Sequence, residues 1–148
     1  MSATYVPLIS SGVAGPLGVL HLPRLWLKAS LEARGKLAAG YPGCGKGYDQ
    51  MVLDGLGLNR DTVLNYIRDQ KPSYSQFEAW VKTQPGVKLD RANVEQLNNA
   101  IRGYNHDDQT RKNILGACGI QDDASACKDA VNLNNLDDWQ EFHQAVLK

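Results

Sequence analysis

The sequence predicts a mainly α-helical fold, a compact single-domain bundle of about six to eight short helices behind a non-helical N-terminal arm. Apolar residues recur at the three- and four-residue spacing of buried helix faces, whereas the period-two alternation of strands is nearly absent. Glycine, proline and asparagine separate these segments at short intervals. The 148 residues suit one domain, residues 1–148, with the Pro85-Gly86 turn as the best candidate for a hinge.

The N-terminal arm covers residues 1–20. Prolines and glycines interrupt it at close intervals, among them Pro7, Gly12, Gly15 and Pro16. A first helix is expected over about Pro23–Ala39, because proline suits the first helical turn, and Gly40 would end it. Charged side chains at four-residue spacing would share one face of this helix: Arg24, Lys28, Glu32 and Lys36.

Three further helices are expected before the Pro85-Gly86 turn. One covers about Tyr48 to Leu56, and the next begins at an Asn59 cap. Another opens with the capping box Ser73 to Gln76, in which two side chains each satisfy a free backbone donor. The apolar residues expected to be buried are Val63, Leu64 and Ile67 in the second helix of the three, and Phe77, Trp80 and Val81 in the third.

Three helices are also expected after that turn. The first runs from Asp90 to Gly103, the second is capped by Asp107 or Asp108 and stops at Gly119, and the last begins near Leu136. Their expected apolar faces carry Val94, Leu97 and Ile101, then Ile114, Leu115 and Cys118, and finally Trp139, Phe142 and Val146.

The charge of the chain is balanced but unevenly distributed. With 16 cations and 16 anions there is no basic excess of the kind that nucleic-acid binding requires, so no nucleic-acid partner is expected. No acid precedes Glu32, whereas the segment from Asn105 to Leu147 is rich in acids. The basic N-terminal third and the acidic C-terminal third could be solvated faces, which is the usual explanation of such charge runs. They could also dock on each other within one chain, or head to tail in a homodimer.

Cysteine content and hydropathy predict a small soluble protein of the cytoplasm. Three cysteines do not form an even disulfide framework, and the first 20 residues lack the basic start of a secretory signal. Cys118 and Cys127 either pair under oxidation or remain buried thiols, the reading we favour. No apolar run reaches the roughly 18 residues that span a bilayer, so no membrane association is expected.

The richest cluster of polar residues starts at His21 and continues through the glycine-rich loop Gly40 to Gly47. The loop nearly matches a phosphate-binding P-loop, but Gly47 stands where a magnesium-binding hydroxyl belongs, and the loop follows a helix rather than a strand. The loop is therefore either a flexible surface loop or an anion-binding nest of backbone amides that includes Gly45, with Lys46 beside it.

The candidate catalytic residues are His21 and Asp49. A neutral histidine can act as a general base, and a carboxylate paired with it would orient the ring. The alternatives are that His21 caps the first helix or packs under the arm. Asp49 could instead only cap the second helix, or pair with Arg24. The candidate ligand-binding residues are Arg24, Lys28, Gly45, Lys46, Tyr48, Trp80, Asn98 and His143.

Among these candidates, the basic residues are expected to bind an anion, whereas those on apolar helix faces have structural alternatives. Arg24 is the better anion ligand of the first helix, because Lys28 has Glu32 four residues away as a partner. Asn98 and His143 interrupt apolar stripes, so each is either a structural hydrogen-bonding residue or part of a pocket wall, and Trp80 is most simply core.

No metal or other cofactor is expected, because histidines and cysteines nowhere show ligand spacing. A site assembled from distant residues such as His21, Cys44 and His143 is the one alternative that spacing leaves open. The chemistry expected of the pocket is therefore that of its side chains and backbone amides alone.

These motifs resemble a bacterial family known as a domain of unknown function. The resemblance rests on His21-Leu22-Pro23-Arg24, Lys28, Asp49, Ala79-Trp80, Asn98 and the segment Leu136 to Trp139, and it covers the chain from about residue 17. It implies a compact, mainly helical, cytoplasmic domain and carries over no established activity. The glycine-rich loop with Cys44 and Lys46 departs from the family pattern.

Two functions fit these observations. The first is a pocket for an anionic small molecule, with cofactor-independent acid–base catalysis of the isomerase or lyase type at His21 and Asp49. The second is a non-enzymatic interaction module that uses complementary basic and acidic surfaces. The clustering of histidine, arginine, aspartate and a glycine loop early in the chain favours the first function.

Overall fold

Side-chain caps fix where most of the helices begin. The computed structural model describes residues 3–148, and in this part of the chain five helices start behind a side chain that accepts a hydrogen bond from a backbone N–H three residues later. These caps are Asn59, Ser73, Asp90, Asp107 and Asp129. Ser73 and Gln76 form the complete capping box that the sequence predicts.

The described residues form seven α-helices, which confirms the mainly helical prediction. The helices are α1 (Leu22–Ala33), α2 (Tyr48–Leu56), α3 (Arg60–Gln70), α4 (Tyr74–Lys82), α5 (Arg91–Gly103), α6 (Asp108–Ala117) and α7 (Ala130–Phe142). A short π-helical turn, η1 (His143–Leu147), extends α7. Among these residues, β-type pairing is limited to three isolated bridges, so no sheet is present.

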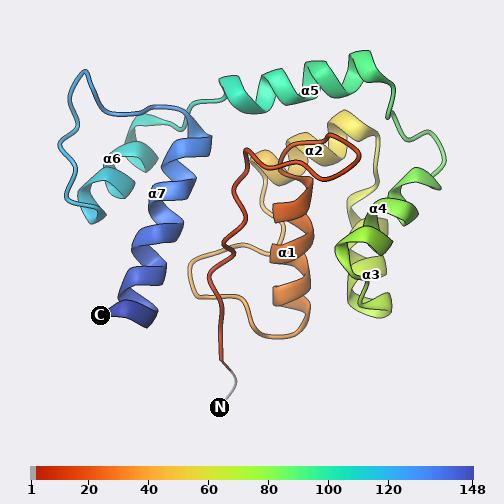
Figure 1. Cartoon of the computed structure of the whole chain (residues 1–148), viewed down its shortest axis with the longest axis horizontal. Coiled ribbons are helices and arrows are strands. Elements are labelled where there is room, and N and C mark those ends of the chain that lie inside the picture. Colours follow the sequence, from red (N-terminus) through yellow and green to blue (C-terminus); the bar gives the residue numbers. More distant parts are fainter. Residues whose placement is uncertain (1–2) are drawn as a thin grey trace.

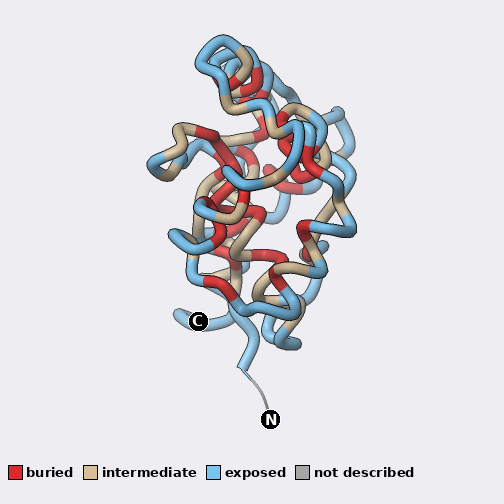
Figure 2. The backbone as a smooth tube through the Cα atoms, turned by 90° about the vertical axis from the view of Figure 1, so that its right-hand side faces the viewer, coloured by how far each residue is buried: buried red, intermediate tan, exposed pale blue. Residues whose placement is uncertain are grey.

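The helices surround α1, which lies at the centre of the molecule (Figure 1). The α3 and α4 helices lie on one side of α1, and α6 and α7 lie on the other, while α5 crosses above and connects the two sides. Buried residues run through the middle of the molecule, and the exposed ones form its outer surface (Figure 2). The largest core cluster joins residues of α1 to α5 and Ala130 at the start of α7. A smaller cluster between α6 and α7 is built around Ile114, Leu115 and Leu133.

The N-terminal arm is non-helical over residues 3–20, as predicted, and residues 1–2 of the predicted arm lie outside the described part of the chain. Tyr5 pairs with the segment around Leu37 through two backbone hydrogen bonds of 2.7 and 3.0 Å. The Asn98 side chain on α5 holds the end of the arm, because it accepts from Leu20 N at 3.0 Å and donates to the Gly18 carbonyl at 2.7 Å. The arm is thereby fixed against α1 and α5.

Two predicted helix boundaries are wrong. The first helix ends at Ala33 rather than near Ala39, because Gly35 adopts φ 68° and the N–H groups of residues 35 and 36 return to the carbonyls of Glu32 and Leu31. The chain can then turn and pair with the arm.

The last helix begins at Ala130, not near Leu136, since Asp129 caps it. Its buried apolar residues are Ala130 and Leu133. Trp139, expected to face the core, is 61% exposed.

Candidate functional site

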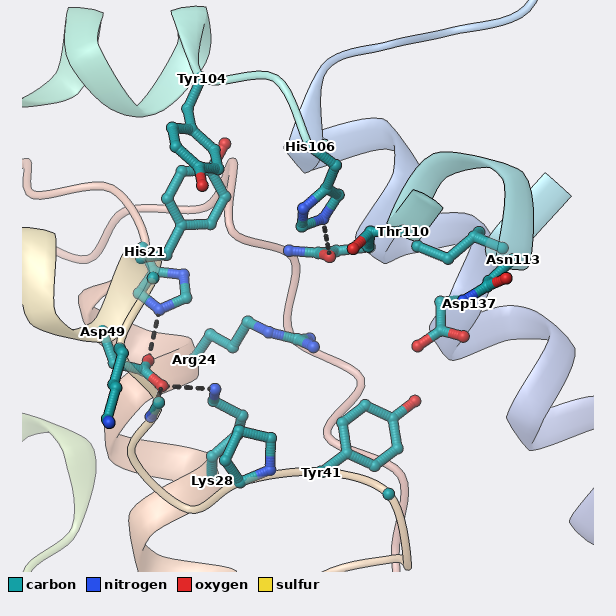
Figure 3. A pocket seen from close by; sticks show the side chains of 18 residues that line it. His21, Arg24, Lys28, Tyr41, Asp49, Tyr104, His106, Thr110, Asn113 and Asp137 are labelled. Carbon is teal, nitrogen blue, oxygen red and sulfur yellow. Dashed lines mark hydrogen bonds and ion pairs between the residues drawn. The ribbon is translucent and has the colours of Figure 1, made fainter. Parts of the chain in front are cut away.

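A pocket of about 470 Å³ opens between the α1–α2 region and the α6–α7 region. Figure 3 shows it with α1 and the glycine loop on one side and α6 and α7 on the other. Its size is within the range of small-molecule sites. The residues that line it are His21, Arg24, Lys28, Gly40, Tyr41, Pro42, Gly45, Lys46, Gly47, Tyr48, Asp49, Tyr104, His106, Thr110, Asn113, Ile114, Asn134 and Asp137.

His21 occupies a strained and buried position immediately before α1. Its φ of 70° lies in the left-handed region, which non-glycine residues seldom adopt, and the residue is 1% exposed. Its Nε2 lies 2.6 Å from Asp49 Oδ1, and its Nδ1 lies 2.9 Å from Ser11 Oγ. Burial lowers the pKa of His21 even though the Asp49 carboxylate acts in the opposite direction, so the neutral ring is favoured.

Both ring nitrogens of His21 are therefore used. Because a carboxylate can only accept, Nε2–H donates to Asp49, and Nδ1 accepts from the Ser11 hydroxyl. Serine, histidine and aspartate thus form a hydrogen-bonded row, of which sequence reasoning missed the serine, Ser11. Ser11 is fully buried and lies outside the pocket lining, so its hydroxyl contacts His21 rather than a ligand.

Asp49 is the anion that the glycine loop holds. Its Oδ2 accepts from Lys28 Nζ at 2.6 Å and from the Gly45 backbone N–H at 2.7 Å. Burial acts to raise the pKa of Asp49, but the hydrogen bond from His21 and the charge of Lys28 outweigh it and hold the pKa below its ordinary value. The predicted pairing of His21 with Asp49 is confirmed.

The expected pairing of Lys28 with Glu32 is wrong. Lys28 turns inward to Asp49, while Glu32 accepts from the Gly43 backbone N–H at 3.0 Å. The buried carboxylate is the stronger attraction, because the low local dielectric strengthens its pairing with an ammonium.

Arg24 is committed to the C-terminal part of the chain. It forms two hydrogen bonds to the Asp138 carboxylate, at 2.5 and 3.1 Å, and donates to the carbonyls of Pro7 and Ile9 at 2.8 and 2.9 Å. Tyr41 also donates to Asp138 at 3.0 Å. The two-point grip expected of Arg24 is present, but the carboxylate belongs to the protein itself. Arg24 is consequently a structural residue that links α1, the arm and α7.

Two further predicted residues, Lys46 and Tyr48, line the pocket and differ in their contacts with the rest of the protein. Lys46 is exposed and lines the pocket. Tyr48 is buried, and its hydroxyl donates to the Ile101 carbonyl at 2.6 Å, so this side chain fixes α2 to the end of α5. Tyr48 shapes the wall, whereas Lys46 can move toward a ligand.

Three predicted ligand-binding residues lie away from this pocket. Trp80 stacks on Tyr66 with ring centroids 4.1 Å apart, and Asn98 holds the arm. His143 is exposed at the start of η1. Each was chosen because it interrupts or centres an apolar stripe, which does not determine where in the fold that stripe lies.

The pocket also contains polar residues that sequence reasoning missed. His106 Nε2 lies 2.8 Å from Asn134 Oδ1, and both residues line the wall opposite α1. Asp137 lines the same wall and is half-buried. Burial raises the pKa of Asp137, and the neighbouring Asp138 and Glu141 carboxylates add to this effect. The acidic segment before Trp139 was the available signal, but it did not indicate which carboxylate faces the pocket.

The cysteines are all free thiols in the structure. Cys44 is half-buried beside Asp49, and burial raises the pKa of its thiol to about 11, which disfavours the reactive thiolate. Cys118 and Cys127 are half-buried and unpaired, rather than fully buried. Within residues 3–148, histidine, cysteine and carboxylate side chains nowhere form a group of three that could hold a metal ion.

Comparisons with protein-family models, curated proteins and solved structures found no match for this chain. The resemblance to the family with the His-Leu-Pro-Arg motif therefore stays a prediction. The described helices include none that is long and apolar enough to cross a membrane.

Proposed function

We propose that the pocket between α1–α2 and α6–α7 binds a small anionic molecule, with Lys28 as its principal ligand. The observation that carries this proposal is the position of the Lys28 ammonium, which lines the pocket and is held by Asp49 at 2.6 Å. An ammonium has three N–H donors, and within residues 3–148 Asp49 accepts from one of them. The remaining donors are available to an anion, and Asp49 fixes their position.

The start of α2 supports the same binding mode. The residues from Gly45 to Asp49 line the pocket, and the N-cap of α2, Gly47, has no side chain to cap the first turn. Unsatisfied backbone N–H groups at a helix N-terminus favour a nearby anion. Lys46 adds a second, exposed cation at the rim. Arg24 is the weaker candidate, because the Asp138 carboxylate and two carbonyls already accept from its guanidinium.

Proton transfer at His21 and Asp49, of the isomerase or lyase type, stays a prediction. For His21 to exchange a proton with a ligand, its hydrogen bond to Ser11 or to Asp49 must first open. Ligand binding is therefore the function that the geometry supports best. The alternative function, an interaction module based on complementary charge, also stays a prediction. Arg24 and Asp138 do not favour it, because they already neutralise each other within the chain.

Thermal unfolding at constant ionic strength tests the proposal, with sodium hexanoate and inorganic phosphate as probes. A ligand that binds only the folded state raises its stability, and at this chain length each kcal/mol raises the midpoint by about 2–4 °C. We expect the midpoint of the wild type to rise with at least one probe. The rise should disappear in Lys28→Met and shrink in Lys46→Ala.

Lys112→Met is the matched control, because Lys112 is an exposed α6 lysine outside the pocket lining. Equal rises in all four proteins would indicate a general salt effect and would exclude Lys28 as the anion ligand. Lys46→Ala keeps the test informative if Lys28→Met folds poorly, since Lys46 is exposed.

A further inference from the structure

We infer that Asp137 binds a hydrogen-bond donor on the same ligand, so that the pocket selects small amino acids or hydroxy acids over simple carboxylic acids. This inference rests on the proposed anion site at Lys28 and names the class of ligand that would fill the whole pocket. In this binding mode, one end of the ligand contacts one wall of the pocket, and its other end contacts the opposite wall.

The two neighbouring acids of α7 have different environments. Asp138 is buried and accepts from Arg24 and Tyr41. Asp137 is half-buried on the pocket wall, and within residues 3–148 its carboxylate accepts no hydrogen bond. Figure 3 shows Asp137 on the α7 side and Lys28 with Asp49 on the α1 side, with Arg24 between them. A ligand that lies across the pocket would meet Asp137 at one end and Lys28 at the other.

The charges around Asp137 indicate what it can bind. Burial and the carboxylates of Asp138 and Glu141 raise its pKa, whereas Arg24 and His106 act to lower it. Partial burial of a carboxylate costs free energy when no donor replaces the water that it loses. A hydrogen bond from a ligand ammonium or hydroxyl would offset that cost. A second anionic group would instead be repelled by the acids of α7. The Asp137 wall therefore favours a donor, and the Lys28 wall favours an anion.

The pocket can hold a ligand with both groups. Its volume of about 470 Å³ exceeds that of a single small anion and suits a chain with a polar group at each end. The donors Lys28 and Lys46 lie on the α1–α2 side, and Asp137 and His106 lie on the α6–α7 side. A simple carboxylic acid would satisfy only the first side.

Isothermal titration calorimetry of the full chain tests this inference with two sets of probes. The first set is hexanoate, 6-hydroxyhexanoate and 6-aminohexanoate, and the second is the set of four-carbon counterparts, which samples a shorter span. We expect the hydroxy acid or the amino acid of one set to bind about tenfold tighter than its unsubstituted acid. Asp137→Asn should remove most of this preference for an amino acid, and less of it for a hydroxy acid, while the unsubstituted acid binds as before.

Glu141→Gln is the matched control, because it removes an exposed carboxylate from the same helix without altering the pocket lining. Equal affinities of the three wild-type probes in both sets, or a preference that survives Asp137→Asn, would overturn the inference and leave the anion site intact. Absence of binding by every probe would refute the anion site itself, and the inference would fall with it. The wild-type comparison is decisive even if Asp137→Asn folds poorly.

Discussion

At the residue scale, Arg24 and Lys28 show how two cations one turn apart acquire different roles. Arg24 has its donors directed at Asp138, Pro7 and Ile9, and it is 4% exposed. Lys28 is held by Asp49 and retains donors toward the pocket. A planar guanidinium can satisfy several fixed acceptors at once, whereas an ammonium at the end of a flexible stem can serve both a partner and a ligand.

Arg24→Met is expected to lower the free energy of unfolding by about 3–5 kcal/mol, because it leaves the buried Asp138 carboxylate without its cation. The double variant with Asp138→Asn should recover part of this loss, since no unpaired charge then remains. Urea denaturation measures both changes. Arg91→Met is the control, because the Arg91 side chain is 92% exposed and pairs only with Glu95 on the helix surface. A loss in Arg24→Met as small as that of the control would contradict a structural role for Arg24.

The buried neutral His21 predicts that stability depends on pH. Its folded pKa lies below the ordinary 6.5, so below pH 6.5 the unfolded chain binds a proton that the folded protein does not. This contribution to stability is complete above pH 6.5 and declines as the pH falls below it, by up to about 1.4 kcal/mol per pH unit. Asp49, whose pKa is also lowered, contributes in the same direction, but only below its ordinary value of 3.8.

Denaturation of the wild type and His21→Gln at several values between pH 5 and pH 8 measures this dependence. The slope should be present in the wild type, absent in His21→Gln and retained in the control His143→Gln, which alters an exposed histidine. A wild-type stability that stays constant over this range would show that His21 is not held neutral by burial.

At the element scale, the contact between α2 and α5 depends on a glycine. A Cβ on Gly55 would lie 2.7 Å from Cδ1 of Leu97, a buried α5 side chain. Gly116 in α6 is a matched comparison, because a Cβ there would meet no atom within 4 Å.

Replacing glycine with alanine is therefore expected to have opposite effects on stability at these two positions. Gly55→Ala should destabilise the protein by about 1–3 kcal/mol, since overpacking of the α2–α5 contact outweighs the gain in helix propensity. Gly116→Ala should stabilise it by up to about 1 kcal/mol, since only the gain in propensity remains. Thermal unfolding of both variants checks the signs, and stabilisation by Gly55→Ala would show that the two helices do not pack so closely.

Helix starts could be predicted from the sequence because their signals are local. Asn59, Ser73 and Asp90 each cap a backbone N–H three residues ahead, so no distant contact is needed to recognise them. The end of α1 was less predictable, because Gly35 competes with Gly40 as a stop signal and the arm pairs with the released segment. The start of α7 is less predictable, because the spacing of Trp139, Phe142 and Val146 indicates a buried stripe, whereas Trp139 is exposed.

At the scale of the whole molecule, helix α7 contributes to two hydrophobic clusters, through Ala130 and Leu133. The larger cluster joins α1 to α5 with the start of α7, and it includes residues on both sides of the Pro85-Gly86 turn. The role of this turn as a hinge stays a prediction. The smaller cluster holds α6 against α7. The Arg24–Asp138 pair adds a link between α1 and α7, and the pocket opens beside it.

The candidate site was only partly predictable, because some of its contacts join residues that are far apart in the sequence. The sequence placed His21, Arg24, Lys28 and the glycine loop together because they are close along the chain. The partner of Arg24 lies 114 residues away, and no local pattern distinguishes Asp138 from Asp137. Only the packing of α7 against the arm and α1 turns one of these acids inward and leaves the other at the pocket.

The measurement that tests the central claim most directly is a titration of the isotope-labelled protein with sodium hexanoate, followed through its backbone amide NMR signals. We predict that the largest changes occur at residues 45–48, beside Lys28 and at the start of α2. The apolar groove lined by Leu8, Val13 and Trp139 offers the hexanoate tail a competing site. Changes centred on that groove, with residues 45–48 unaffected, would contradict an anion site at Lys28.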